Sequence, residues 1–194
     1  IRLSLVGSEM CIRDRDFPEF EFHSYHPSEG YVLTSFIKRD HKGDPPGYAV
    51  IIDMEGDVVW YRKFPGQVFF FEEHPNGNFI AFGNQKLDKM KIDGHYYELD
   101  KMGEVVREYS AKQGKTDHHE FKIMKDGYMV PSVSYDTVML SDLGFSGVGK
   151  RKVVLQNDAV EYHKTGGKML RWSSVETLNV ETLSHIKNIN ELND

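Results

Sequence analysis

The chain has 194 residues, of which 39% are hydrophobic and 28% are charged, and this composition predicts a soluble domain with a folded core. No stretch approaches the roughly 20 consecutive apolar residues that a membrane-spanning helix needs. The net charge of −6 disfavours a nucleic-acid partner, because binding phosphates requires a basic surface.

The first segment, residues 1–15, resembles a translated sequencing-library adaptor, most clearly from Gly7 to Asp14. We interpret residues 1–15 as a cloning or assembly scar and residues 16–194 as the natural domain. The single cysteine, Cys11, falls in the scar, so we expect neither a disulfide nor a thiolate site in the rest. The chain starts at Ile1 and stops as a new segment begins, which we read as a reading frame cut at both ends.

Hairpin patterns follow one another along the remaining chain. Residues 49–61, 96–106 and 159–172 each place a turn glycine between β-branched or aromatic flanks, and the first two have an Asp three positions before that glycine. A second type of hairpin, at residues 71–80 and 121–130, alternates with the first. Each type recurs after roughly 50 residues, which is typical of propeller blades. The fold class predicted is therefore all-β: an incomplete β-propeller of about three to four four-stranded blades.

Other segments have simpler interpretations. Val68 to Phe71 reads as a buried strand, and Trp60 and Trp172 fall at or next to the same repeat position, which favours packing between blades. Residues 134–151 form an insertion rich in Gly, Ser and Asp, which we expect to be a loop. The insertion contains G-x-x-x-x-G-K at 144–150, but an arginine replaces the Ser or Thr of a phosphate loop and a strand follows, so we expect no nucleotide site.

The strongest candidate site is the run Asp117-His118-His119-Glu120-Phe121, which the repeat places at the start of a blade's first strand, the strand that lines a propeller channel. Alternation along that strand would send His118 and His119 to opposite faces. In one hypothesis a histidine oriented by Asp117 or Glu120 binds an anion or acts as an acid or base. In the other, equally open, backbone groups satisfy both histidines and the acids are solvated.

We expect no metal and no cofactor. His23 and His26 lie three residues apart but lack the helical context of a zinc site, and solvated side chains are the preferred interpretation.

The order and spacing of several motifs, from about Gly30 to about Asn188, resemble the arylsulfotransferase family. The resemblance rests on residues 47–61, His74-Pro75-Asn76-Gly77-Asn78, Tyr97-Glu98-Leu99-Asp100, the run 117–121, Asp126-Gly127 and Leu170-Arg171-Trp172-Ser173-Ser174. It implies a parent propeller of about six blades. It also implies transfer of a sulfuryl group from an aryl sulfate ester to a phenol through a sulfated histidine, without a nucleotide donor. Export to the periplasm, or secretion, is implied as well.

The resemblance also implies site residues. The D-x-H-E-F motif maps onto Asp117, His119, Glu120 and Phe121, so His119 is the expected channel-facing catalytic residue, with His118 beside it and with Asp117 and Glu120 binding substrate. The family's His-x-Asn pair has its nearest match in His185 and Asn188, one residue too long. The histidine that accepts the sulfuryl group is implied to lie beyond Asp194, so this chain alone is expected to be inactive. The alternative is a non-catalytic propeller that binds a protein or a sugar. If no further blades complete the propeller, we expect a homo-oligomer or a partner to cover the exposed edge strands.

Overall fold

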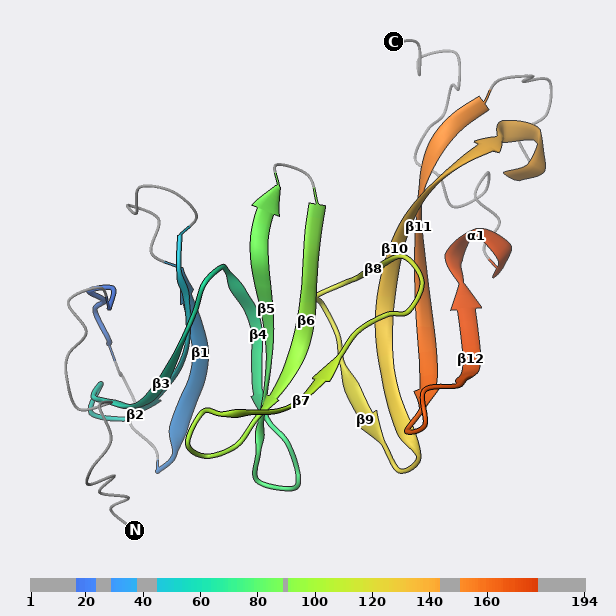
Figure 1. The fold of residues 1–194 in the computed structure, drawn as a ribbon. Helices are drawn as coiled ribbons and strands as arrows, with labels where there is room; N and C mark the ends of the chain where they lie inside the picture. The colour runs from blue at the N-terminus through green and yellow to red at the C-terminus, as the bar shows by residue number, and fades with distance from the viewer. Residues whose placement is uncertain (1–16, 24–28, 38–44, 89–90, 144–150, 178–194) are drawn as a thin grey trace. The chain divides into compact units, whose positions relative to one another are not determined.

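The computed structural model describes residues 17–23, 29–37, 45–88, 91–143 and 151–177 of the chain (Figure 1). The chain divides into two compact units, residues 1–110 and 111–194. The described residues form antiparallel sheets of three, four and five strands. This confirms the prediction of an all-β, incomplete β-propeller-like fold. Residues 1–15, interpreted above as a scar, lie outside the described residues.

The first unit contains two sheets. The three-stranded sheet has the order β1-β2-β3, with β1 at Tyr31–Ile37, β2 at Gly47–Asp53 and β3 at Val58–Phe64. The four-stranded sheet has the order β4-β5-β6-β7, with bounds Val68–Glu73, Phe79–Asp88, Lys91–Leu99 and Val105–Tyr109. Every neighbouring pair in these sheets is antiparallel, and consecutive strands are neighbours, as short hairpin connections require.

The hairpin turns have the chemistry that their sequences predicted. In the β2–β3 turn, Asp53 Oδ1 accepts hydrogen bonds from the backbone N–H groups of Glu55 at 3.1 Å and Asp57 at 2.8 Å. In the β6–β7 turn, Asp100 Oδ1 accepts the equivalent bonds from Met102 and Glu104, both at 2.9 Å. The turn glycines have φ of 92° at position 56 and 82° at position 103, a region where side chains are strained.

Strand β2 is buried on both faces, which explains its uninterrupted run of apolar residues. Ala49 and Ile51 face the four-stranded sheet. Tyr48, Val50 and Ile52 point the other way, where the segment 17–23 covers them with the aromatic rings of Phe17, Phe20 and Phe22. Period-two alternation along one strand therefore supplies two separate clusters of the first unit.

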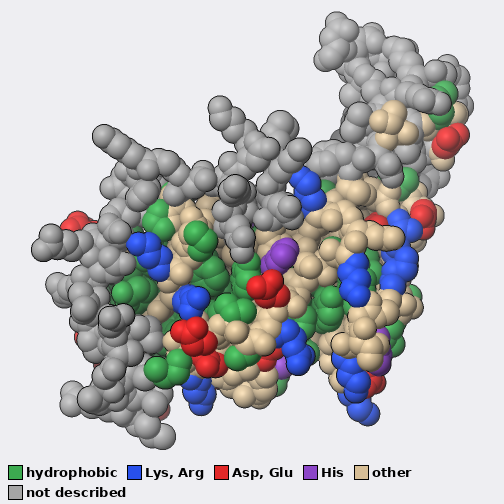
Figure 2. All heavy atoms as spheres, in the orientation of Figure 1, with side chains coloured by type: hydrophobic (Ala, Val, Ile, Leu, Met, Phe, Trp, Pro, Cys, Tyr) green, Lys and Arg blue, Asp and Glu red, His purple; other side chains and the backbone are tan. Residues whose placement is uncertain are grey.

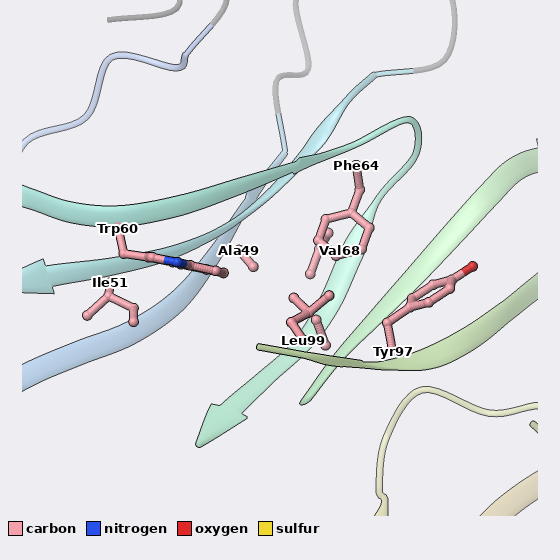
Figure 3. Close-up of a cluster of buried hydrophobic side chains, with 8 residues drawn as sticks. Ala49, Ile51, Trp60, Phe64, Val68, Tyr97 and Leu99 are labelled. Atoms are coloured by element: carbon pink, nitrogen blue, oxygen red, sulfur yellow. The ribbon is translucent and has the colours of Figure 1, made fainter. Parts of the chain in front are cut away.

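The main core lies between the two sheets of the first unit (Figure 3). Trp60 is 6% exposed, stacks on Phe71 with ring centroids 5.5 Å apart, and donates from Nε1 to the carbonyl of Lys101 at 3.1 Å. Arg62, two residues along the same strand, donates to the carbonyl of Gly103. Trp60 thus packs between sheets, as predicted.

The β4 segment is also a strand as expected, although only Val68 in it is fully buried and its three phenylalanines are half-buried.

The second unit holds one sheet in the order β12-β11-β10-β8, with β9 also pairing β10. The bounds are Lys115–Thr116 for β8, Lys122–Met124 for β9, Gly127–Met139 for β10, Arg151–His163 for β11 and Lys168–Ser173 for β12. A 3-10 helix, η2 at Leu140–Leu143, follows β10, and a short helix, α1 at Ser174–Thr177, follows β12.

The prediction that residues 134–151 form a loop is wrong over much of this segment. β10 and β11 continue their pairing from Ser134 opposite Gln156 out to Met139 opposite Arg151, so the insertion lengthens a hairpin. Backbone pairing depends on main-chain groups and does not need an apolar sequence, which is why the composition was misleading. The phosphate-loop-like residues 144–150 lie outside the described residues.

The expected burial of Trp172 is also wrong, because its side chain is 41% exposed. The hairpins β2–β3, β6–β7 and β11–β12 each have a β-bulge at the equivalent position. Next to this bulge Trp60 pairs with Ile51, and the equivalent pair in the β11–β12 hairpin is Leu170 with Glu161. Trp172 therefore holds the position of Arg62, two residues further along.

Among the described residues, no helix has the length and apolar character needed to cross a bilayer. Basic and acidic side chains are interspersed with hydrophobic ones over the described part of the face shown in Figure 2.

Candidate functional site

The run Asp117 to Phe121 lies between two strands and not within one. β8 ends at Thr116, opposite Ser132, and β9 begins at Lys122, opposite Met129. The five residues 117–121 therefore lie opposite only two residues of β10, Val130 and Pro131, and the chain leaves the ladder there. The prediction that this run forms the start of a strand is wrong, because the strand that follows it, β9, begins only at Lys122.

Pro131 gives the physical reason for this excursion. The backbone N–H of Asp117 donates to the carbonyl of Pro131 at 3.0 Å. In a regular antiparallel pair the opposite residue would return a bond from its own N–H, but proline has none. The ladder between β8 and β10 therefore ends at the bond from Asp117 to Pro131, and β9 resumes the pairing with β10 from Lys122 onward.

Asp117 holds His119 at two points. The Oδ1 atom of Asp117 accepts a hydrogen bond from the backbone N–H of His119 at 2.9 Å, and it lies 2.6 Å from Nδ1 of the His119 ring. The Asp117 side chain is only 18% exposed, whereas that of His119 is 74% exposed. The carboxylate is thus fixed close to the sheet, and it holds an imidazole that faces solvent.

His118 and His119 lie side by side, which corrects the expectation that they point to opposite faces. Their ring centroids are 4.0 Å apart and their planes are inclined by 31°. Alternation applies to extended strands, and these two residues form a bend. The pKa of His118 is lowered, first by burial and second by the neighbouring His119, while Asp117 acts in the opposite direction. The Nδ1 atom of His118 is shielded from solvent.

The far end of the run is anchored by Phe121, which is 3% exposed and lies with its ring centroid 6.3 Å from that of Tyr128. Glu120, by contrast, is exposed. The buried ring and the Asp117–Pro131 bond therefore fix both ends of the excursion, and Glu120 faces water between them.

The excursion gathers three groups that can each bind a metal ion. One potential ligand atom from each of Asp117, His118 and His119 lies within 4.8 Å of the other two. The sequence interpretation missed this grouping because it assumed strand alternation. The signal that was available was Pro131, placed where the partner strand would have needed its N–H.

The sequence model of the arylsulfotransferase (ASST) family matches residues 23–191. The chain belongs to the arylsulfotransferase family. This membership indicates arylsulfotransferase-like function at the family level, with aryl sulfates and phenols as the substrate class. Comparisons with curated proteins and with solved structures gave no match.

The arylsulfotransferase match includes all the candidate site residues predicted from the sequence, but the structure describes only some of them. Asp117, His118, His119 and Glu120 are brought together on one short excursion, as described above. His185 and Asn188 lie outside the described residues, as does His26. His23 lies 3.5 Å from the carboxylate of Glu21, and both side chains are largely exposed, in keeping with a solvated histidine.

Proposed function

We propose that this protein, as part of its full-length parent, transfers a sulfuryl group from an aryl sulfate ester to a phenol through a sulfated histidine. His119 and His118 are catalytic side chains that help to hold the sulfuryl group in this part of the site, and Asp117 and Glu120 bind substrate beside them. The histidine that accepts the sulfuryl group belongs to another part of the parent. This chain then carries part of the sulfate site and is inactive by itself. The observation that carries the proposal is the fixed, solvent-facing imidazole of His119.

The contacts of His119 suit such a role. Asp117 engages its backbone N–H and its Nδ1 atom, so the ring is held in one orientation. Nε2 is on the opposite edge of the ring, and with 74% of the side chain exposed, that edge is open to a ligand. A group that is oriented before substrate arrives loses little freedom on binding, which is how positioned side chains accelerate a reaction.

The chemistry needs one nucleophile and several groups that hold the sulfuryl oxygens. In the first half-reaction a histidine nitrogen bonds to sulfur and the bond from sulfur to the aryl oxygen breaks, and the leaving phenolate takes up a proton from an acidic group or water to become the phenol. In the second, the acceptor hydroxyl gives its proton to a basic group or water as its oxygen bonds to sulfur, and the nitrogen–sulfur bond breaks. Side chains placed around the sulfuryl oxygens lower the barrier by stabilising the charge that develops there.

The test uses the full-length parent protein with 4-nitrophenyl sulfate as donor and phenol as acceptor. In His119→Ala we expect kcat/KM to fall by about 100-fold or more, the usual effect of removing a group that stabilises the transition state. His95→Ala is the matched control, because His95 is a partly exposed histidine that pairs with Glu108 on the four-stranded sheet. Undiminished transfer by His119→Ala would remove His119 from the site. A folded parent without any transfer activity would favour a non-catalytic binding module.

We also propose export to the periplasm or secretion of the parent, on the strength of the family resemblance. Fractionation of cells that express the parent checks this, and recovery in the cytoplasmic fraction alone would contradict it.

A homo-oligomer would cover the outer strands β7 and β12, whose backbones have unpaired edges in the described sheets. Sedimentation velocity of the parent measures its oligomeric state.

A further inference from the structure

We propose that Asp117, His118 and His119 form a binding site for one divalent transition-metal ion of the zinc, cobalt or nickel class. This inference concerns a ligand that the proposed function does not include. It rests on the contacts of the excursion between β8 and β9, and it holds whether or not the protein transfers sulfuryl groups.

The distances allow the three side chains to bind one ion with a small rearrangement. Bonds from zinc to nitrogen and oxygen are about 2.0–2.2 Å long, so neighbouring ligand atoms in such a site are about 3–3.5 Å apart. Oδ1 of Asp117 and Nδ1 of His119 are hydrogen-bonded at 2.6 Å and would have to move slightly apart, and one potential ligand atom from each of the three residues lies within 4.8 Å of the others. Binding an ion would replace the side-chain contact between Asp117 and His119, and the exposed His119 ring has room for that shift.

The ligand set selects the class of ion. Two imidazoles and one carboxylate suit zinc and its neighbours in the first transition series, whereas calcium and magnesium prefer sites made wholly of oxygen. Three protein ligands also leave at least one coordination position for water or for an added ligand.

A turn-capping role for Asp117 explains only part of the arrangement of Asp117, His118 and His119. Asp53 and Asp100 accept the same kind of backbone bond in their hairpin turns, and their turns contain no histidine. A capping role therefore accounts for the bond from Asp117 to the backbone of His119. It does not require two imidazole rings in contact at 4.0 Å next to the capping carboxylate.

The excursion is also held in place at both ends, which reduces the cost of bringing the ligands together. Its first residue is bonded to the carbonyl of Pro131, and its last, Phe121, is buried. If the proposed function also holds, a bound ion has a consequence for it. The ion outweighs the negative charge of Asp117, so the open coordination position attracts an oxygen of a sulfate ester.

Direct titration tests the site. The parent protein, purified without a polyhistidine tag, is titrated with Co²⁺ while its visible absorption is recorded, and with Zn²⁺ in a calorimeter. We expect one ion per chain, with absorption bands of a nitrogen- and oxygen-ligated Co²⁺. We also expect affinity to fall at least about 10-fold in each of Asp117→Asn, His118→Ala and His119→Ala, since even outer-shell changes cost that much. His95→Ala should bind like the wild type.

Near-ultraviolet circular dichroism establishes that each variant is folded. If a ligand variant does not fold, paramagnetic broadening by Co²⁺ in the wild type decides the matter, because it must be strongest at the signals of residues 117–119. Wild-type protein that binds no Co²⁺, or variants that bind it unchanged, would overturn the proposal. No assay here measures sulfuryl transfer, so a failed metal site leaves the proposed function standing, and an inactive parent that binds Co²⁺ leaves the metal site standing.

Discussion

Replacing Glu98 with glutamine should weaken the first unit measurably. Glu98 is on β6 and is only 6% exposed. Its Oε1 atom accepts hydrogen bonds from Nδ2 of Asn76 at 2.9 Å and of Asn78 at 2.7 Å, and its Oε2 atom accepts one from the hydroxyl of Tyr109 at 2.7 Å. One carboxylate thereby ties the β4–β5 turn and the outer strand β7 to the centre of the sheet.

The magnitude follows from the charge of the acceptor. A hydrogen bond to a charged group contributes about 1.5–3 kcal/mol and one between neutral groups about 0.5–1.5 kcal/mol. Glu98→Gln keeps one oxygen for the two asparagines and places an amide NH₂ opposite Tyr109, whose hydroxyl can turn to accept from it. The geometry survives and the charge is lost, so we expect a decrease of about 1–3 kcal/mol in the free energy of unfolding at pH 7.

The pH dependence supplies a second readout. Burial by itself would raise the pKa of Glu98, but the hydrogen bonds from Tyr109, Asn78 and Asn76 outweigh it and hold that pKa below its ordinary value. Because the folded-state pKa is depressed, the stabilisation is present above the unfolded-state pKa and is lost as the pH falls through the folded-state pKa. The difference between wild type and Glu98→Gln should therefore shrink as the pH falls below about 4.5, the region of an ordinary glutamate. Burial, and then Glu98 itself, raise the pKa of Tyr109 to about 12, so the hydroxyl remains a donor throughout this range.

Urea unfolding at pH 7 and at pH 3 measures both effects. The chain has two tryptophans, so a Trp172→Phe background leaves Trp60 as the fluorescent reporter of the first unit. Glu104→Gln is the control, because the Glu104 side chain is 77% exposed and its removal should change stability by less than about 0.5 kcal/mol. A Glu98→Gln variant as stable as the wild type at pH 7, or one whose deficit persists undiminished at pH 3, would refute the reasoning.

Further substitutions test the packing of each unit by urea unfolding followed by far-ultraviolet circular dichroism, which does not depend on either tryptophan. Trp60→Ala should lower the free energy of unfolding by about 3–5 kcal/mol, because a buried ring and its bond to the Lys101 carbonyl are lost; Trp172→Ala, at an exposed ring, should cost far less, and equal losses would contradict the assigned core. Gly127→Ala should cost at least about 1–3 kcal/mol through overpacking, because its added carbon would lie 1.8 Å from the carbonyl oxygen of Tyr162. Gly167→Ala meets nothing within 4 Å and serves as the control; a Gly127→Ala variant that matches it would show that the two backbones are not in close contact.

Much of the fold is predictable because its turns are encoded locally. Asp53 and Gly56 specify a turn through a side-chain acceptor and a positive φ, and both features appear in the structure. The third hairpin shows the limit of this approach. It has two adjacent glycines, and the positive φ of 89° belongs to Gly166, whereas the predicted equivalence of Trp172 and Trp60 requires Gly167 to be the turn glycine. That choice shifts the strand that follows by one residue, which placed Trp172 next to the position of Trp60 when it is in fact two residues away.

Strand pairing was harder to predict than turns. The residues from Ser134 to Met139 continue β10, although the composition of the insertion indicated a loop. Their partner in the ladder is β11, the next strand of the hairpin, and no local signal in either segment shows how far the two strands remain paired. Pairing over such separations is fixed by the register of the whole hairpin, which propagates outward from its inner residues.

The candidate site combines both kinds of information. The residue types of the run 117–121 pointed to chemistry, but their arrangement depends on Pro131, which lies on the opposite strand. Had the ladder continued, alternation would have separated His118 from His119 and left Asp117 on one face with a single imidazole. The missing N–H of Pro131 instead releases the run from the ladder, and the released backbone lets Asp117 fold back onto His119. The same local break in pairing therefore accounts for the wrong strand assignment and for the cluster on which both proposals rest.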